Sequence, residues 1–558
     1  MTEVQAPLGS RIPFRIRVGV TGHRDVGPDG RLAGVPSQVR RLVPESDATR
    51  VLLGAVSELA EGADRLVVEA LFEGEHARGD DARLDVVLPF ERQLYVELQD
   101  FSDASTAEFD SWMSRATSVV ELNGSPKPAA QDASYEAASR YLVNRCDVLV
   151  ALWRGRPSGG RGGTAETLLY AATLGKPCIW IPAEPGLPAS DNIGDGRKAS
   201  FLDEVRNRAH PPSGTAHDER APRARVLKPL EEAYRALDEF NRASLPSEPE
   251  LRSRLEDELG NLDPDSDWVA GPFVRAAVLA DRYESRFTLA TWLMWLLATA
   301  ASVCLGVSAA LTHGSKPWAW AEVGCLVALL VVFAAARRVG LHRRWLTCRL
   351  LAERLRSAYF IAPTGIDFRR SGGLETVFVE RQSADWLLRA FEEVWDSRPG
   401  AIGPPRTPSP VELDDLKRRL ADEWVGGQVE FHRRAQRSHE RRGRALTSVI
   451  VVLIAGGVLS ALLHAWTHGR VEEIATFLSI TLPVTAAALG AILTVRQHRA
   501  LAERYARMHS DLLAVRESLL DADVETIGKA ASEAARVIAE ESGDWFGAMW
   551  FLDVEEPP

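Results

Sequence analysis

The chain has 558 residues, of which 46% are hydrophobic and 26% are charged, and its formal net charge at pH 7 is −11. This length predicts two to four domains, and the acidic balance argues against a general nucleic-acid-binding protein, which is normally basic. The five cysteines lack the close spacing of a zinc site or a redox motif. We therefore expect no metal, no cofactor, no structural disulfide and a reducing compartment. The first residues contain no apolar run typical of a signal peptide.

Residues 1–185 predict an α/β domain with a doubly wound parallel sheet. Apolar strands are expected at residues 15–20 ("RIRVGV"), 83–90, 146–153 and 177–181. Helices are expected at residues 51–60, 65–72, 135–144 and from residue 164 onward. Continuous apolar strands that alternate with helices are typical of a parallel sheet covered on both faces.

Small and polar residues gather where these strands and turns end, which is where ligands bind in parallel sheets. The candidate ligand-binding residues are Gly19, Thr21, Gly22, His23, Arg24, Gly62, Asp64, Arg65, Gly160, Gly162, Gly163, Thr164 and Glu166. Glycines let backbone N–H groups approach a phosphate, a helix N-terminus adds partial positive charge, and arginines neutralise anionic oxygens. One such loop alone is more often a tight turn with a helix cap, but three together favour a nucleotide-type ligand. The sequence contains neither a dinucleotide fingerprint nor a phosphate-binding loop with its lysine.

Residues 186–268 predict a polar insertion followed by a helical connector. The stretch from Asp191 to Ala221 is rich in polar residues, glycine and proline, so we expect it to lie outside the sheet as a flexible insertion. Amphipathic helices are expected at residues 226–244 and 273–287. These helices are either a simple connector or a lever between the first domain and the rest of the chain.

Four apolar stretches predict an α-helical membrane region. They cover residues 289–311, 318–336, 446–463 and 474–495. A helix rises 1.5 Å per residue, so each stretch is long enough, or nearly so, for a hydrocarbon core of about 30 Å. Buried helices of a large soluble core are the alternative, but four stretches of this length favour transmembrane helices. Short connections within each pair predict two helical hairpins.

Arginines are distributed unevenly around the four stretches. They cluster before the first and third stretches and after the second and fourth, for example at Arg337, Arg338, Arg441 and Arg442. The two short connections carry one basic residue each when histidine is neutral. By the positive-inside rule we expect a multi-pass protein of the cell inner membrane with cytoplasmic N- and C-termini.

The two hairpins carry signs of an internal duplication. "RLLAERLR" begins at Arg349 after the second stretch, and "RALAERYAR" begins at Arg499 after the fourth. Asp-Trp pairs follow at Asp385 and Asp544. We expect two similar two-span units at residues 269–395 and 413–558, joined by a proline-rich linker at 396–412. The segments after the spans show helical apolar periodicity, so we expect either solvated helices or helices that pack against a second unit or subunit.

These motifs resemble known families. "VGVTGHR", "AEGADRLVVEAL" and "GGTAETLLYAATLGKPCIWIP" are similar to the SLOG superfamily over about residues 14–185, which includes the DNA-uptake protein family and the LOG nucleotide hydrolases. The resemblance implies a Rossmann-like fold that binds nucleotides or nucleotide-derived signals. The paired spans and "LAER" helices resemble SLATT membrane domains. Proteins that join the two resemble prokaryotic conflict-system effectors, in which a sensed nucleotide triggers membrane damage.

The sequence departs from the LOG hydrolases within their Pro-Gly-Gly-x-Gly-Thr-x-x-Glu signature. Gly163, Thr164 and Glu166 match it, but Arg161 stands in place of a glycine, and Arg140 is shifted by about two residues from the family's helix arginine. Glu166 and Arg140 are therefore only alternative catalytic residues. A carboxylate and an arginine would be enough for an oxocarbenium-like reaction.

The first functional hypothesis is a cytoplasmic sensor of a nucleotide or NAD-related signal, coupled to a four-span membrane effector. We expect a homo-oligomer that lies in the lipid bilayer and binds no nucleic acid. Its expected role is antiviral defence, and one form of this hypothesis has the spans form a pore. The alternative is a membrane-tethered hydrolase of a nucleotide or NAD-related N-glycoside. The third hypothesis is a membrane scaffold whose nucleotide-binding fold no longer binds a ligand.

Overall fold

The structure is a computed structural model. It describes residues 8–27, 29–72, 82–158, 161–184, 189–193, 197–210, 228–260, 266–312, 316–366, 385–399, 410–495 and 498–550. The chain forms two compact units, each assembled from separate stretches of sequence. Residues 11–244 and 381–404 form the sheet unit, and residues 1–10, 245–380 and 405–558 form the helical unit.

A seven-stranded sheet forms the centre of the sheet unit. Its strands are β1 (Phe14–Gly22), β2 (Val51–Ser57), β3 (Arg83–Leu88), β4 (Ser118–Glu121), β5 (Val148–Trp153), β6 (Cys178–Pro182) and β7 (Ser190–Asp191). The order is β4-β3-β2-β1-β5-β6-β7, and every neighbouring pair is parallel except β6 and β7. Strand order therefore reverses between β1 and β5, which is the place where doubly wound sheets bind ligands. The predicted fold class is confirmed.

Helices surround this sheet. They are α1 (Val35–Arg40), α2 (Ala63–Phe72), α3 (Arg92–Gln99), α4 (Asp103–Ser114), α5 (Pro128–Arg145), α6 (Thr164–Thr173), α7 (Arg197–Ala209), α8 (Lys228–Arg242) and α14 (Asp385–Asp396). A short 3-10 helix, η1 (Gly30–Gly34), precedes α1. Helices α5 and α6 pack against one another, and α14 contacts both β1 and α8.

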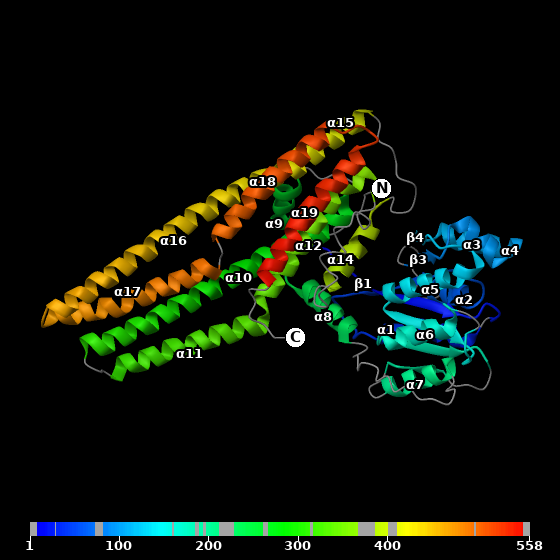
Figure 1. Cartoon of the computed structure of the whole chain (residues 1–558), viewed down its shortest axis with the longest axis horizontal. Helices are drawn as coiled ribbons and strands as arrows, with labels where there is room; N and C mark the ends of the chain where they lie inside the picture. Colours follow the sequence, from blue (N-terminus) through cyan, green and yellow to red (C-terminus); the bar gives the residue numbers. More distant parts are fainter. Residues whose placement is uncertain are drawn as a thin grey trace. The chain divides into compact units, whose positions relative to one another are not determined.

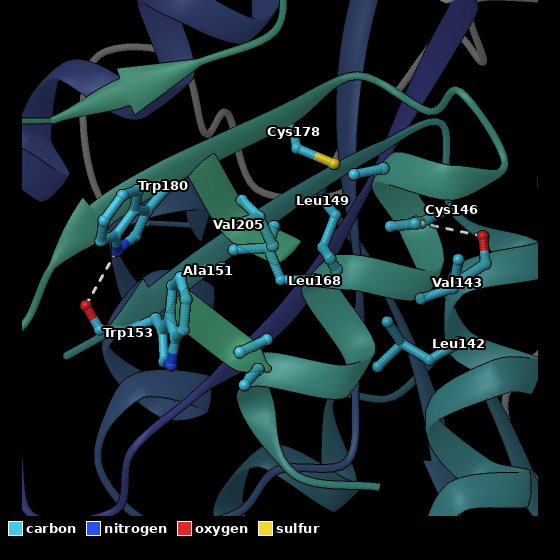
Figure 2. Packing of buried hydrophobic residues seen from close by; sticks show 14 of the residues in the cluster. Leu142, Val143, Cys146, Leu149, Ala151, Trp153, Leu168, Cys178, Trp180 and Val205 are labelled. Carbon is cyan, nitrogen blue, oxygen red and sulfur yellow. Dashed lines mark hydrogen bonds between the residues drawn. The ribbon is translucent and has the colours of Figure 1, made fainter. Parts of the chain in front are cut away.

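An apolar core lies between β5, β6 and the helices α5, α6 and α7 (Figure 2). Leu149, Leu168 and Cys178 are fully buried there. The indole N–H of Trp180 donates to the backbone oxygen of Trp153 at 2.8 Å, so this large aromatic side chain enters the core without losing its hydrogen bond. The core makes β5 and α6 a firm support for the loops at their ends.

Two sequence predictions for this unit were wrong. Residues 51–57 form the buried strand β2 rather than a helix, because a short apolar run buried on both faces has no period that distinguishes strand from helix. The stretch from Asp191 to Ala221 does not lie wholly outside the sheet. Its first residue, Asp191, ends β7, and helix α7 buries Phe201 and Val205 in the core.

Long helices form the second unit. They are α9 (Glu248–Leu259), α10 (Asp267–Gly306), α11 (Lys316–Val339), α12 (Leu341–Ile361), α15 (Pro410–Arg418), α16 (Gly426–Trp466), α17 (Arg470–Val495), α18 (His498–Asp521) and α19 (Ile527–Trp550). Short π- and 3-10 segments continue three of them: η4 (Val307–Leu311), η5 (Ala362–Thr364) and η7 (Arg419–Val425). Helix α10 packs beside α11 and α17, and α17 packs beside α16 (Figure 1).

Four helical stretches are long and apolar enough to cross a membrane, which confirms the predicted count. They lie within Asp267–Leu311, Lys316–Thr364, Glu412–Trp466 and Arg470–Ala491, with mean hydropathies of 1.9, 2.2, 2.5 and 1.8. The protein buries only a small part of the most apolar stretch of each helix, and it buries no part of the one in α11. An apolar helix surface that the protein leaves uncovered is expected where lipid is the solvent.

The helical unit contains two successions of helices of similar length. Helices α10, α11 and α12 have 40, 24 and 21 residues, and α16, α17 and α18 have 41, 26 and 24. In both successions the first helix packs against the second and the third. The two "LAER" motifs lie at matching places, on α12 and α18.

Candidate functional site

The loops at the carboxyl ends of β1 and β2 and before α6 surround one pocket with a volume of ≈ 250 Å³. The lining residues are Val20, Thr21, Gly22, Arg24, Glu58, Ala60, Asp64, Tyr95, Gln99, Tyr135, Ser139, Leu142, Arg161, Gly162, Gly163, Thr164 and Thr167. Seven of the candidate residues named from the sequence are among them. The pocket lies at the end of β1, and the strand order reverses between β1 and its neighbour β5.

Two glycines bring the end of β1 close to the start of α2. A Cβ atom on Gly22 would lie 2.2 Å from the Cβ of Ala63, and one on Gly62 would lie 2.1 Å from the backbone oxygen of Arg24. Gly62 also has a φ of +73°, which disfavours other residues. The backbone N–H of Ala63 donates to the backbone oxygen of His23 at 3.1 Å. Gly62 and His23 thus hold the loop that carries Arg24, but they do not line the pocket.

Two more candidate residues lie away from the pocket. The Arg65 side chain is buried and donates to the backbone oxygens of Leu59 and Ser105 and to the carboxylate of Glu108. Gly19 faces α5, because a Cβ there would lie 2.7 Å from the sulfur of Cys146. Both residues support neighbouring elements. Gly160 lies outside the described residues.

The loop before α6 is held against α5. Gly162 has a φ of +78°, and a Cβ there would lie 2.5 Å from the backbone nitrogen of Glu136. The Glu166 carboxylate accepts a hydrogen bond from the Gly162 N–H at 3.0 Å, and the Ser139 hydroxyl lies 3.2 Å from the Gly162 oxygen. Gly163 is the N-cap residue of α6. Gly163 and Thr164 therefore present the N-terminal end of α6 to the pocket, where helix amide groups favour an anion.

The side of the pocket formed by β2 and α3 carries polar groups that the sequence motifs did not reveal. The hydroxyl of Tyr95 and the side-chain oxygen of Gln99 are buried, and neither has a hydrogen-bond partner within the part of the chain that the structure describes. The Gln99 amide donates to the Tyr135 hydroxyl at 2.8 Å. Buried polar atoms are rarely left without a partner, so these two atoms are available to a polar group that enters the pocket.

Two carboxyl groups share this side. Burial raises the pKa of Glu58 to about 8, and repulsion from Asp64 adds to the effect. Burial also raises the pKa of Asp64 to about 6, although the Ser57 hydroxyl donates to it at 3.0 Å. At neutral pH a protonated Glu58 is able to donate a hydrogen bond as well as accept one. Perturbed carboxyl groups that meet in a cleft are typical of functional sites.

The alternative catalytic residues lie in an adjoining hollow of ≈ 340 Å³, which shares Ser139, Arg161, Gly162 and Thr167 with the first pocket. Arg140 and Glu166 both line this hollow. Arg140 is paired with Glu136 at 2.5 Å, and Glu166 is bound to the Gly162 N–H. The structure thus places these two residues together, beside the glycine-lined pocket rather than within it.

Within the described ranges, no group of three or more histidine, cysteine, aspartate or glutamate side chains is arranged to hold a metal ion. The five cysteines are free thiols. The site is therefore a pocket of backbone amides, arginines, carboxyl groups and phenols.

Comparison with known proteins identifies part of the helical unit. Residues 421–545 match the family model described as "SMODS and SLOG-associating 2TM effector domain 1", abbreviated SLATT_1. The matched segment contains α16 and α17, two of the four candidate spans, and the helices α18 and most of α19. Searches of the curated proteins and of the solved structures gave no match. The C-terminal part of the chain thus fits a two-span membrane effector domain.

Proposed function

We propose that the chain is a membrane effector controlled by a nucleotide or a nucleotide-derived molecule, which the sheet unit binds. The observation that carries this proposal is the pocket: three segments far apart in the sequence meet at the switch point of the sheet, in the same chain as a two-span effector domain. In this proposal the ligand favours one arrangement of the spans by binding it more tightly than the other.

The two sides of the pocket favour a ligand with a phosphate at one end and hydroxyl groups at the other. Gly163, Thr164 and the nearby Arg161 suit a phosphate. Glu58 and Tyr95 suit ribose hydroxyl groups, because a carboxyl group and a phenol supply both donors and acceptors. The pocket volume of ≈ 250 Å³ suits a compound of mononucleotide size or one part of a larger NAD-related molecule.

Binding is tested by calorimetry on the full-length protein in lipid nanodiscs, with AMP, NAD and ADP-ribose as probes. At least one probe should bind, and Gly163→Val should weaken it by about tenfold or more, because a β-branched side chain blocks the approach of phosphate to the backbone. Gly27→Val is the matched control, since Gly27 is outside the pocket and a Cβ there meets no atom within 4 Å. Absence of binding by all three probes, or full affinity in Gly163→Val, would contradict the proposal.

A second candidate function is hydrolysis of an N-glycosidic bond, which the raised pKa of Glu58 favours. A carboxyl group that is protonated at neutral pH is able to give its proton to a departing base while water attacks the anomeric carbon. The Glu166 and Arg140 pair of the LOG resemblance would have to act from the adjoining hollow. Chromatography of the calorimetry samples decides between the two functions, because hydrolysis of an N-glycosidic bond releases a free base, namely adenine from AMP or nicotinamide from NAD.

For the membrane part we propose two copies of the effector domain, homo-oligomeric assembly and cytoplasmic termini in the inner membrane, as part of a prokaryotic defence system. The matched helix lengths and the two "LAER" helices support the duplication. The arginines beside the span ends support the orientation. A simple anchor needs one span, so four spans favour a separate task for the membrane part, such as forming a pore.

A further inference from the structure

Helix α14 belongs to the sheet unit, although in the sequence it follows the first pair of spans. Residues on both sides of the stretch 381–404 belong to the helical unit, so the chain leaves that unit, forms α14 and returns. The helix buries Trp386, Leu387, Phe391 and Trp395. The Asp-Trp pair of the first repeat lies on α14, and that of the second repeat lies on α19. Helix α19, the equivalent of α14, packs on α12 and α18 within the helical unit. The first repeat thus contributes its last helix to the other unit.

Glutamates near the end of α14 are bound by arginines of the sheet. Arg15 on β1 donates two hydrogen bonds to the Glu393 carboxylate, both at 2.9 Å. Arg17, two residues further along β1, contacts Glu392 at 2.6 Å. Arg145 at the end of α5 contacts Glu392 at 3.0 Å.

Further ion pairs extend the contact on both sides. Arg83 of β3 lies 3.4 Å from the Glu393 carboxylate and 3.2 Å from that of Asp396. In one further pair the arginine lies on α14 and the carboxylate lies beside the sheet. Arg389 of α14 donates to both carboxylate oxygens of Asp147, which precedes β5, at 2.6 and 2.7 Å. Although burial acts to raise the pKa of Asp147, the Arg389 guanidinium lowers it to about 2.

These contacts are buried, which separates them from ordinary surface ion pairs. The side chains of Arg15 and Glu393 are 9% and 8% exposed, and that of Asp147 is 4% exposed. Removing one member of a buried ion pair is strongly unfavourable, because the remaining charge stays buried without compensation. The charges therefore make the position of α14 specific, and removing one partner weakens its docking on the sheet.

The elements that hold α14 also line the ligand pocket. Strand β1 carries Arg15 and Arg17 at one end and the pocket residues Thr21 and Gly22 at the other. Helix α5 carries Arg145 at its end and the pocket residues Tyr135 and Ser139 further back. Both elements are regular and packed, so each connects the pocket to the ion pairs through continuous secondary structure.

We propose that α14 is a releasable latch: docked on the sheet it holds the spans in their closed arrangement, and its release opens them. The proposal rests on the proposed function, since the ligand is what weakens the docking. In this proposal β1 and α5 carry the signal from the pocket to the segment between the two pairs of spans.

The test measures ion flux from liposomes that contain the full-length protein, without any nucleotide. Glu392→Lys/Glu393→Lys places two lysines among four arginines and should raise flux by about tenfold or more over the wild-type protein. Glu392→Gln/Glu393→Gln, a milder change, should give an intermediate flux. The matched control is Glu533→Lys/Glu540→Lys on α19, where both glutamates pair with the half-exposed Arg536 on the same helix. Its flux should equal that of the wild-type protein.

Hydrogen exchange on the same samples shows whether α14 is released while β1, β5 and α6 stay protected. If hydrogen exchange shows that α14 is released in the Glu392/Glu393 variants while ion flux stays at background, the latch proposal is wrong. High ion flux in the α19 control variant would also overturn it. Addition of AMP, NAD and ADP-ribose separates the two proposals. If a probe opens the wild-type protein and released α14 does not, the latch is wrong and ligand control stands. If released α14 opens the spans and no probe does, the latch stands and ligand control fails.

Discussion

Glu58 and Asp64 place two carboxyl groups in one pocket whose burial disfavours charge on both. A group whose pKa is raised on folding stabilises the folded state while it is protonated, and this contribution is lost as pH rises toward the folded-state pKa. For Glu58 the loss extends from its ordinary value of 4.5 up to about 8. For Asp64 it is nearly complete by about pH 6. The interval between pH 6.5 and 8.5 therefore isolates Glu58.

We predict that the melting temperature of the wild-type sheet unit within the full-length protein falls by roughly 2–4 °C over this interval. Glu58→Gln, which cannot ionise, should remove most of that fall. The measurement is thermal unfolding followed by tryptophan fluorescence at closely spaced pH values. Ser37→Ala, a change in the short helix α1 outside the pocket lining, provides a control that should keep the wild-type slope. An equal slope in Glu58→Gln and wild type would mean that Glu58 is ionised throughout.

At the residue scale the sequence revealed the glycine loops and missed the opposite side of the pocket. Glycines at strand ends are visible locally, because few other residues allow such close approach. Glu58 was hidden because residues 51–60 were predicted as a helix, so it was not placed at a strand end. Tyr95 and Gln99 lie one turn apart on α3, and only the tertiary fold brings them to the pocket.

Helix α11 is the element with the least protein around it. The described part of the helix has no buried residue, and Val327 near its middle is 56% exposed. If lipid covers this surface, Val327→Arg should cost about 2.5–3.5 kcal/mol of insertion free energy, the value for arginine at the centre of a transmembrane helix. We predict that much of this variant fails to reach the membrane fraction that resists alkaline extraction.

Leu174→Arg is the control for that change. Leu174 follows α6 in the sheet unit and is 45% exposed, so an arginine there remains in water. Its membrane fraction should equal that of the wild-type protein. If Val327→Arg also resists extraction to the wild-type extent, α11 is covered by water or by protein rather than by lipid.

Elements differ in how far the sequence predicts them. The apolar spans were predicted because the thickness of a bilayer imposes a length that few soluble helices share. Strand β4 has four residues, none of them buried, so it gave no apolar pattern. The position of α14 depends on ion pairs with residues more than 200 positions away, and no local pattern encodes such partners.

At the scale of the whole molecule, the chain joins a doubly wound sheet unit to a helical unit with four candidate spans. The sequence predicted both, because each has its own hydrophobic pattern. The sequence did not predict that each unit is assembled from separate stretches of the chain. In this arrangement the segment between the two pairs of spans contributes helix α14 to the sheet unit. A simple succession of domains would not produce this contact.

Ion flux from liposomes that contain the purified full-length protein, with AMP, NAD or ADP-ribose added, shows whether the pocket controls the membrane part. The account predicts that a probe which binds also raises flux by about tenfold or more, and that Gly163→Val stays at background with any of them. The Gly27→Val control should respond as the wild-type protein does. A probe that binds or is consumed while flux stays at background would contradict the account, because the pocket would then not control the membrane part.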